Sequence, residues 1–196
     1  MSGARIATLD PSGYGRTAWK NGGGVAIDIA GESRPGPASI GWDATLWRFG
    51  RTTISTGGPY SDLTGFDRLQ MVVAGRGLVL QTPAGEIDVR EPFVAVRFRG
   101  EPAIVSRLES GPVEVVNLIA ARSHAAIDLG SLAATQPEVL KPGRHVIYAP
   151  LDACALRCGG TRHELAADHA LRVDCDNDVV IECLSGRALV ASIFLA

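Results

Sequence analysis

The sequence predicts an all-β protein that consists of two similar halves. Glycine and proline account for 23 and 11 of the 196 residues, and they interrupt the chain at short intervals. Between them lie runs rich in β-branched residues, such as GVAIDIA, GLVLQT and EPFVAVRF, which are typical of strands. Helical periodicity is almost absent. The exception is residues 122–138, whose Ala and Ser content predicts a short helix or a coil linker.

An internal repeat supports the division into two halves. When the chain is displaced by 75 residues without a gap, MVV (71–73) aligns with VIY (146–148), and Gly85 aligns with Gly160. Turn signals and apolar runs coincide along this alignment although identity is low. A repeat of this kind predicts two copies of one β-barrel or sandwich, joined by an internal duplication in one compact chain.

The two copies differ in length, which predicts that they have different roles. The second copy lacks an equivalent of residues 15–60, so we expect the first copy to carry the function and the second to supply a packing partner. We expect an N-terminal barrel at residues 1–121, a linker at 122–140 and a smaller second half at 141–196.

Composition restricts the class of partner. The formal net charge is −2, and the 19 basic and 21 acidic residues form no run of like charges. Neither a nucleic-acid footprint nor a polybasic membrane anchor is indicated, so a small molecule is the expected partner. Because the edges of β-barrels often pair, we also expect a homodimer.

The expected location is the cytoplasm. The first residues, MSGARIATLDPSG, lack the apolar segment of a signal peptide, and no stretch approaches the length of a membrane span. The four cysteines are expected to be free, buried thiols, because a cytoplasmic chain of this length does not need disulfide bonds. They are Cys154, Cys158, Cys175 and Cys183.

The stretch VVAGRGLVL (72–80) looks like the strand, Gly-x-Gly turn and strand of a cupin barrel. Metal-binding cupins carry two His and a Glu before this turn and a third His after it. Here the preceding segment contains no histidine, Arg68 falls at the position of the family's Glu, and the later His falls near Arg97. Because a guanidinium has no lone pair for a metal, the resemblance implies a metal-free barrel with a cationic pocket and no cofactor.

Two simpler interpretations of these arginines stand beside that one. Arg68 can pair with Asp67 or Asp62, which precede it closely in the chain. Arg97 can lie on the solvent face of its strand, because Val96 and Phe98 have the opposite parity.

The segment WKNGGG (19–24) contains more glycine than one turn needs. An Asn-Gly step predicts a hairpin, because both residues tolerate positive φ. The additional glycines favour a second interpretation, in which backbone N–H groups approach an anionic ligand and Lys20 adds a positive charge.

Three longer stretches carry a resemblance that covers nearly the whole chain. TAWKNGGGVAIDIA, LWRFGRTTISTGGPYSDLTGFDRLQMVVAGRGLVL and RLESGPVEVVNLIAARS resemble the blocks of the HutD/Ves family in order and spacing. The resemblance implies a bicupin fold without a catalytic metal and an association with histidine-utilisation operons. It also implies binding of a small acidic intermediate, such as N-formylglutamate or urocanate, by a protein that modulates histidine utilisation.

The resemblance also implies the ligand-binding residues. Trp47 matches the family as well, and core packing is the simpler role for both Trp19 and Trp47. The expected site residues are Trp19, Lys20, Asn21, Gly22, Gly23, Gly24, Arg48, Ser61, Asp67, Arg68 and Asn117.

The chain departs from the family pattern at several positions. Ala18 replaces a Pro, Ala26-Ile27 replaces Thr-Arg, and Val115 replaces an Asp. The last two changes remove one cation and one anion from the expected surroundings of the pocket, so the ligand can differ from that of the family.

Two alternative functions remain at this point. One is a metal-independent isomerase or epimerase of the cupin type, with Asp67 or Lys20 as acid or base. Such chemistry normally uses a His-Asp pair, and residues 1–123 contain no histidine, so binding is favoured over catalysis. The other is a structural or assembly partner without a ligand, in which the glycines form only turns.

Overall fold

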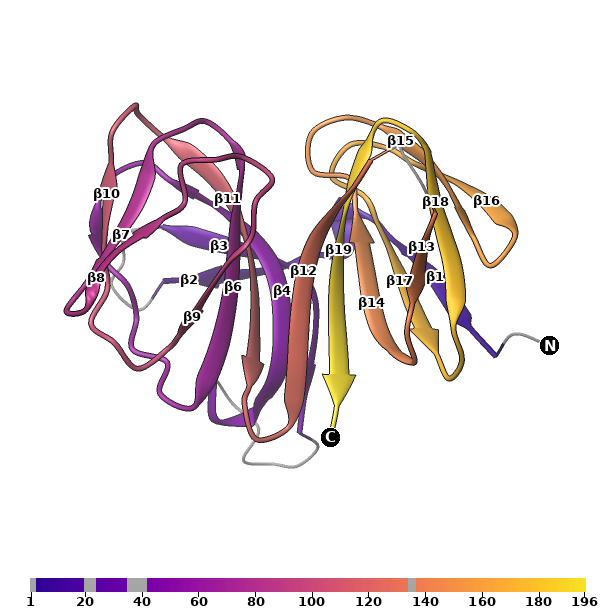
Figure 1. Cartoon of the computed structure of the whole chain (residues 1–196), viewed down its shortest axis with the longest axis horizontal. Coiled ribbons are helices and arrows are strands. Elements are labelled where there is room, and N and C mark those ends of the chain that lie inside the picture. Colours follow the sequence, from indigo (N-terminus) through magenta and orange to yellow (C-terminus); the bar gives the residue numbers. More distant parts are fainter. Residues whose placement is uncertain (1–2, 20–23, 35–41, 134–136) are drawn as a thin grey trace. The chain divides into compact units, whose positions relative to one another are not determined.

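The computed structural model describes residues 3–19, 24–34, 42–133 and 137–196, and it is almost entirely β-structure (Figure 1). The chain divides into two compact units. One contains residues 15–125 and Ala196, and we call it the first sandwich. The other contains residues 1–14 and 126–195, and we call it the second sandwich. The all-β prediction is confirmed.

The first sandwich is built from two antiparallel sheets. The larger sheet has six strands in the order β2 (Gly15–Ala18), β3 (Val25–Ser33), β4 (Thr45–Ile54), β11 (Val113–Ala121), β6 (Phe66–Ala74) and β9 (Val96–Arg99). The smaller sheet has four strands in the order β5 (Gly58–Pro59), β10 (Val105–Leu108), β7 (Leu78–Thr82) and β8 (Gly85–Asp88).

The second sandwich has the same plan with five and four strands. Its larger sheet has the order β1 (Arg5–Leu9), β17 (Ala170–Cys175), β14 (Gly143–Tyr148), β19 (Arg187–Leu195) and β12 (Ala125–Ala133). Its smaller sheet has the order β13 (Glu138–Leu140), β18 (Val179–Ser185), β15 (Cys154–Cys158) and β16 (Thr161–Leu165).

Strand order confirms the internal duplication. The run β4-β11-β6-β9 corresponds to β12-β19-β14-β17, and β5-β10-β7-β8 corresponds to β13-β18-β15-β16. The strands from β6 to β11 recur close to 75 residues later as β14 to β19. The strands β2 and β3, which precede this repeat, enlarge the first sandwich and have no counterpart in the described part of the second.

The predicted domain boundaries differ from those in the structure. Residues 125–133, expected in a linker, form β12, because buried Ala125, Ile127 and Leu129 alternate with exposed residues and this period of two is that of a strand. Residues 138–140 form β13. At the other end, β1 pairs with β17, so residues 5–9 belong to the second sandwich.

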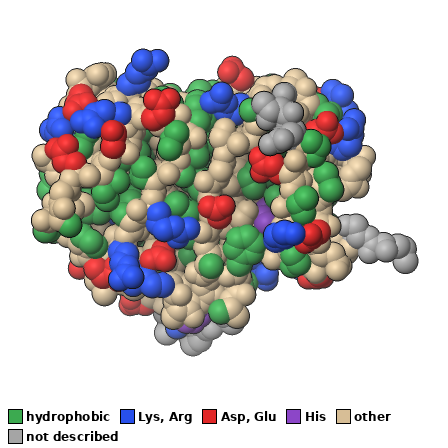
Figure 2. Space-filling model, in the orientation of Figure 1, with side chains coloured by type: hydrophobic (Ala, Val, Ile, Leu, Met, Phe, Trp, Pro, Cys, Tyr) green, Lys and Arg blue, Asp and Glu red, His purple; other side chains and the backbone are tan. Residues whose placement is uncertain are grey.

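The described residues contain two helices, both single 3₁₀ turns: η1 (Pro11–Gly13) and η2 (Trp42–Ala44). Within the described ranges, no helix is long and apolar enough to cross a membrane. On the face that Figure 2 displays, basic and acidic side chains are interspersed, as the absence of charge runs in the sequence predicts.

The two interiors are packed differently. The core of the first sandwich includes Val72, Leu80 and Val115, with Trp19 and Tyr60 packed against it. The core of the second sandwich contains buried aliphatic residues and all four cysteines. These cysteines are free and buried, as predicted.

Close approach of β3 and β4 generates a first prediction. A Cβ atom at Gly50 would lie 2.5 Å from the carbonyl oxygen of Ile27, so the substitution Gly50→Ala must displace backbone. We expect Gly50→Ala to lower the free energy of unfolding by about 1–3 kcal/mol in urea denaturation. Gly58→Ala is the matched control, since a Cβ there meets nothing within 4 Å. Equal stability of the two variants would contradict this account of Gly50.

Candidate functional site

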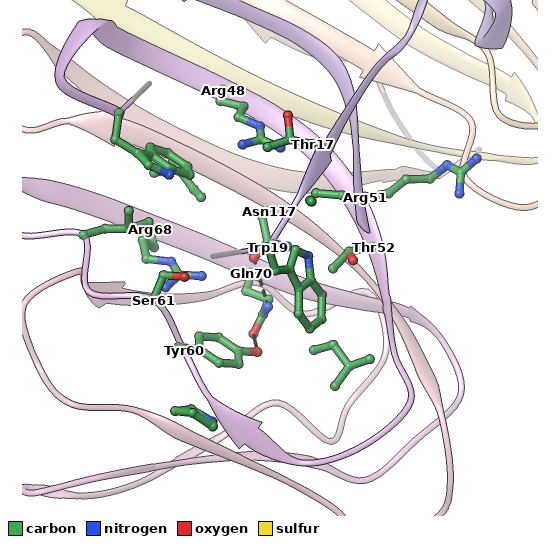
Figure 3. Close-up of a pocket in the computed structure, with 18 residues that line it drawn as sticks. Thr17, Trp19, Arg48, Arg51, Thr52, Tyr60, Ser61, Arg68, Gln70 and Asn117 are labelled. Carbon is green, nitrogen blue, oxygen red and sulfur yellow. Dashed lines mark hydrogen bonds between the residues drawn. The ribbon is translucent and has the colours of Figure 1, made fainter. Parts of the chain in front are cut away.

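A cavity of about 130 Å³ opens in the first sandwich (Figure 3). Strands β2, β4, β6 and β11 contribute to its wall, together with residues 59–61 and Trp42. Its polar lining includes Thr17, Arg48, Thr52, Ser61, Arg68, Gln70 and Asn117. Arg51 also borders the cavity, but in Figure 3 its side chain points away from the centre.

Strand register explains why two arginines lie on this face. Ile119 on β11 pairs with Arg48 on β4 on one side and with Arg68 on β6 on the other. Directly paired residues of antiparallel strands project from the same face of a sheet. The next residue of this row, Phe98 on β9, pairs with Arg68.

Arg68 is the most unusual of the lining residues. Its side chain is only 8% exposed, and its guanidinium carbon lies 4.9 Å from the centroid of the Tyr60 ring and 5.0 Å from that of Phe98. The Nε atom is buried and has no hydrogen-bond partner in the described part of the chain. The aromatic rings therefore hold the cation in place without neutralising it.

Asp67 and Asp62, which are close to Arg68 in the sequence, form hydrogen bonds with other residues. Asp67 accepts a hydrogen bond of 2.7 Å from Nε of Arg122, which also pairs with Glu101 at 2.8 Å. Asp62 accepts hydrogen bonds from the backbone and hydroxyl of Thr64. Asp67 precedes Arg68 on one strand, and adjacent strand residues point to opposite faces, so Asp67 is absent from the described lining of the cavity.

Burial shifts the protonation equilibrium of Arg68. Removal from water lowers the pKa of its guanidinium to about 10, with the neighbouring Tyr60 acting in the opposite direction. Burial also raises the pKa of the Tyr60 hydroxyl. Arg68 remains charged at neutral pH, but the folded state disfavours this charge at every pH below about 10. An anion in the cavity would remove that cost.

A chain of amide hydrogen bonds lies in the next row of the sheet. The Tyr60 hydroxyl donates to Oε1 of Gln70 at 3.1 Å, and Nε2 of Gln70 donates to Oδ1 of Asn117 at 2.9 Å. Gln70 and Asn117 are directly paired across β6 and β11. This chain fixes the orientation of Asn117, whose amide nitrogen is left as a donor for a bound molecule.

Arg48 differs from Arg68 because it has a carboxylate partner. Its Nε donates to Oδ1 of Asp28, and its guanidinium carbon lies 5.3 Å from the centroid of the Trp42 ring. Asp28 also accepts a hydrogen bond of 2.7 Å from Thr17. Arg48 therefore contributes shape and hydrogen-bond donors to the cavity, while its charge is balanced.

The predicted hairpin around the glycine run is confirmed at its two ends. Strands β2 and β3 pair antiparallel, with Ala18 opposite Val25, and the Trp19 N–H donates to the Gly24 carbonyl at 2.9 Å. A Cβ at Gly24 would lie 3.2 Å from the Trp19 indole, which lines the cavity. The intervening residues Lys20, Asn21, Gly22 and Gly23 lie outside the described residues, so their proposed role stays a prediction.

Five of the expected site residues line the cavity: Trp19, Arg48, Ser61, Arg68 and Asn117. Sequence reasoning missed several others. The period of two along strands could have identified Gln70 from Arg68 and Thr52 from Arg48. Tyr60 directly precedes Ser61, which the sequence analysis places in the site.

Trp42, Trp47 and Arg97 lie in three different environments. Trp42 is in the 3₁₀ turn η2, where no periodic pattern applies. Trp47 is buried in the core, at 1% exposure. Arg97 is exposed on β9 while its neighbour Phe98 is buried, in agreement with strand alternation.

The second sandwich has a different residue at each equivalent position. A displacement of 75 residues places Gly143 where the first sandwich has Arg68, and His145 and Ser192 where it has Gln70 and Asn117. His145 contacts Ser192 at 2.9 Å, so a polar pair is retained. A Cβ at Gly143 would lie 3.1 Å from the ring of Phe194, which occupies the position of Ile119. A phenylalanine therefore packs where the first sandwich has its cation.

The residues that metals require do not gather in the part of the chain described. No group of three or more His, Cys, Asp or Glu side chains lies together there in a way that could hold a metal ion. The described cavity instead offers guanidinium, amide and hydroxyl groups, which suit a carboxylate or another small anion.

Comparison with known proteins identifies relatives of the chain. A family model described as HutD matches residues 12–191. A curated Pseudomonas putida protein, named an uncharacterized 21.2 kDa protein in the hutC 3′ region, is 30% identical over 116 residues. The match covers 59% of this chain and 58% of that relative, so it spans less than two thirds of either.

Solved structures show the fold. A conserved protein of unknown function from Pseudomonas aeruginosa PAO1 matches with a TM-score of 0.81 and 24% identity, over 97% of this chain and 98% of that one. HutD from Pseudomonas fluorescens SBW25 matches with a TM-score of 0.80 and 23% identity, over 98% and 100%. More distant matches, at 8% identity, are cupin-fold proteins, which confirms the predicted bicupin fold.

The lowered pKa of Arg68 predicts a characteristic pH profile for anion binding. We expect the affinity for a small carboxylate such as propionate to decrease above about pH 10, approaching tenfold per pH unit, because the guanidinium loses its proton there. Isothermal titration calorimetry from pH 7 to 11, with circular dichroism to verify the fold, measures it. Tyr60→Phe is the control for the phenol and should keep the decrease. An affinity independent of pH up to 11 would contradict the assignment.

Proposed function

The chain belongs to the HutD family, and on that premise we propose that its first sandwich binds a small organic acid whose carboxylate rests on Arg68. The observation that carries the proposal is a buried guanidinium in the wall of a cavity, whose Nε has no hydrogen-bond partner among the residues that the structure describes. Buried charges in proteins are normally paired, because an isolated ion loses several kcal/mol of hydration. A carboxylate ligand supplies the missing partner.

The cavity also provides the other contacts that a small acid needs. A guanidinium can hold a carboxylate through two parallel hydrogen bonds, each contributing about 1.5–3 kcal/mol. The amide of Asn117 supplies a further donor, and Trp19, Trp42 and Tyr60 supply aromatic walls that exclude water. Together these contacts are of the order required for micromolar binding, about 8 kcal/mol.

The family and its gene context support a more specific ligand. We propose an intermediate of histidine degradation, such as urocanate or N-formylglutamate, since the curated relative is encoded next to hutC and the family is HutD. In this proposal the protein modulates histidine utilisation by binding the acid, with no metal or cofactor. Lys20, Asn21 and the glycines at 22–24 follow Trp19 directly in the chain, and we assign their charge and N–H groups to the same ligand.

A ligand screen by thermal unfolding tests the proposal. Urocanate, N-formylglutamate, glutamate and histidine are the probes, with chloride at equal ionic strength as the reference. A ligand at 100 times its dissociation constant should stabilise the protein by about 2.7 kcal/mol, and for a chain of this size each kcal/mol is about 2–4 °C. A flat response to every acid would overturn the proposal.

Arg68→Met separates the functional role of this residue from a structural one. The substitution removes a buried, unpaired charge while retaining volume against Tyr60 and Phe98, so we expect the free protein to gain about 1–2 kcal/mol of stability. The same variant should lose the thermal shift with carboxylates. Urea denaturation and thermal unfolding measure the two effects.

Arg157→Met is the matched control for this experiment. Arg157 is half-exposed in the second sandwich and pairs with Glu182, so its substitution should change neither stability nor binding by much. A destabilised Arg68→Met that still binds carboxylates would show that Arg68 is a structural residue.

A further inference from the structure

Two arginines on the same face of the sheet line the cavity, and in the described part of the chain only one of them has a carboxylate partner. Arg48 and Arg68 flank Ile119 in one row, separated by the single strand β11. Since neighbouring strands lie about 4.8 Å apart, the two backbones are about 10 Å apart. A ligand with two carboxylates could therefore bind both guanidinium groups, one at each carboxylate.

Only one of these two cations is available to a ligand without competition. Arg68 has no carboxylate partner in the described part of the chain. Arg48 is held by Asp28 and stacks against Trp42. The exposed fractions of the two paired side chains are 19% for Arg48 and 25% for Asp28, so water screens this ion pair only in part.

The backbone around Asp28 is arranged to make this pairing possible. Asp28 is opposite Gly50, and the register of β3 against β4 shifts between Asp28 and Ala30, as at a β-bulge. A Cβ at Gly50 would lie 3.4 Å from Oδ1 of Asp28, so the missing side chain leaves space for the carboxylate. Thr17 fixes the other carboxylate oxygen with a hydrogen bond of 2.7 Å.

From this arrangement we infer that Asp28 is a specificity-determining residue that keeps Arg48 from binding a second carboxylate of the ligand. Asp28 neutralises Arg48, and Arg68 alone then offers an unbalanced positive charge among these three groups. A monocarboxylate completes the charge balance. A second carboxylate placed at Arg48 must either remain without a partner beside Asp28 or displace Asp28 from Arg48.

The inference rests on the proposed function and restricts the class of acid that the cavity binds. Of the two acids named above, urocanate carries one carboxylate and N-formylglutamate carries two. Asp28 therefore favours the unsaturated monocarboxylate, whose planar shape also suits the aromatic walls formed by Trp19, Trp42 and Tyr60.

A charge-removal series tests this inference with simple acids. The probes are propionate and crotonate as monocarboxylates, and succinate and glutarate as dicarboxylates, titrated by calorimetry at constant ionic strength. The measured quantity is the ratio of dicarboxylate affinity to monocarboxylate affinity. The wild type should prefer monocarboxylates, and Asp28→Asn should raise the ratio at least tenfold, because it releases Arg48 without changing the shape of the side chain.

Two further variants identify the cause. In Asp28→Asn/Arg48→Gln the ratio should return to the wild-type value, because the released cation has been removed. Asp28→Ser removes the same charge with a smaller side chain, and it replaces Asp28→Asn if that variant does not melt cooperatively.

The possible outcomes separate this inference from the proposed function. If the wild type binds monocarboxylates and Arg68→Met does not, but the ratio stays constant in the Asp28 variants, the inference about Asp28 is overturned and the proposed function stands. If the ratio rises equally with and without Arg48, the inference is also overturned. If no carboxylate binds the wild type, the proposed function itself fails.

Discussion

The first sandwich contains a buried guanidinium, that of Arg68, which has no carboxylate partner among the described residues. Arg68 lies against the rings of Tyr60 and Phe98, and burial lowers its pKa to about 10. Cation–π contacts offset only part of the lost hydration, at about 0.5–2 kcal/mol each. The free protein therefore keeps an unfavourable interaction in its interior, at the wall of a cavity. Such strain is typical of sites that are completed by a ligand.

The two sandwiches share their strand order but differ in the side chains at equivalent positions. Strand order, strand pairing and a buried polar pair are common to both, as Gln70 with Asn117 and His145 with Ser192 demonstrate. The position of Arg68 is a glycine in the second sandwich. The replacement of Arg68 by glycine and of Ile119 by Phe194 removes the buried cation from this face of the second sandwich.

Much of this architecture could be predicted from the sequence, because strands are governed by local alternation and turns by glycine. The same alternation placed Arg97 outside and Phe98 inside. The linker predicted at 122–140 differs from the structure because the buried Ala125, Ile127 and Leu129 have the period of two of a strand, which the Ala and Ser content of the segment does not reveal. Asp67 pairs with Arg122 and is absent from the described lining, because neighbouring residues of a strand face opposite ways. The pairing of Asp28 with Arg48 depends on the register of β3 against β4, which no local pattern specifies.

Nitrogen-15 NMR of the arginine side chains tests the central claim most directly, because Nε–H of Arg68 is a buried donor that has no partner among the described residues. In a titration with a small carboxylate, its resonance should shift with saturation and its hydrogen exchange should slow, while the Arg157 signal stays constant. Chloride at the same ionic strength should have little effect. Saturable carboxylate binding that leaves the Arg68 resonance unperturbed would contradict the account.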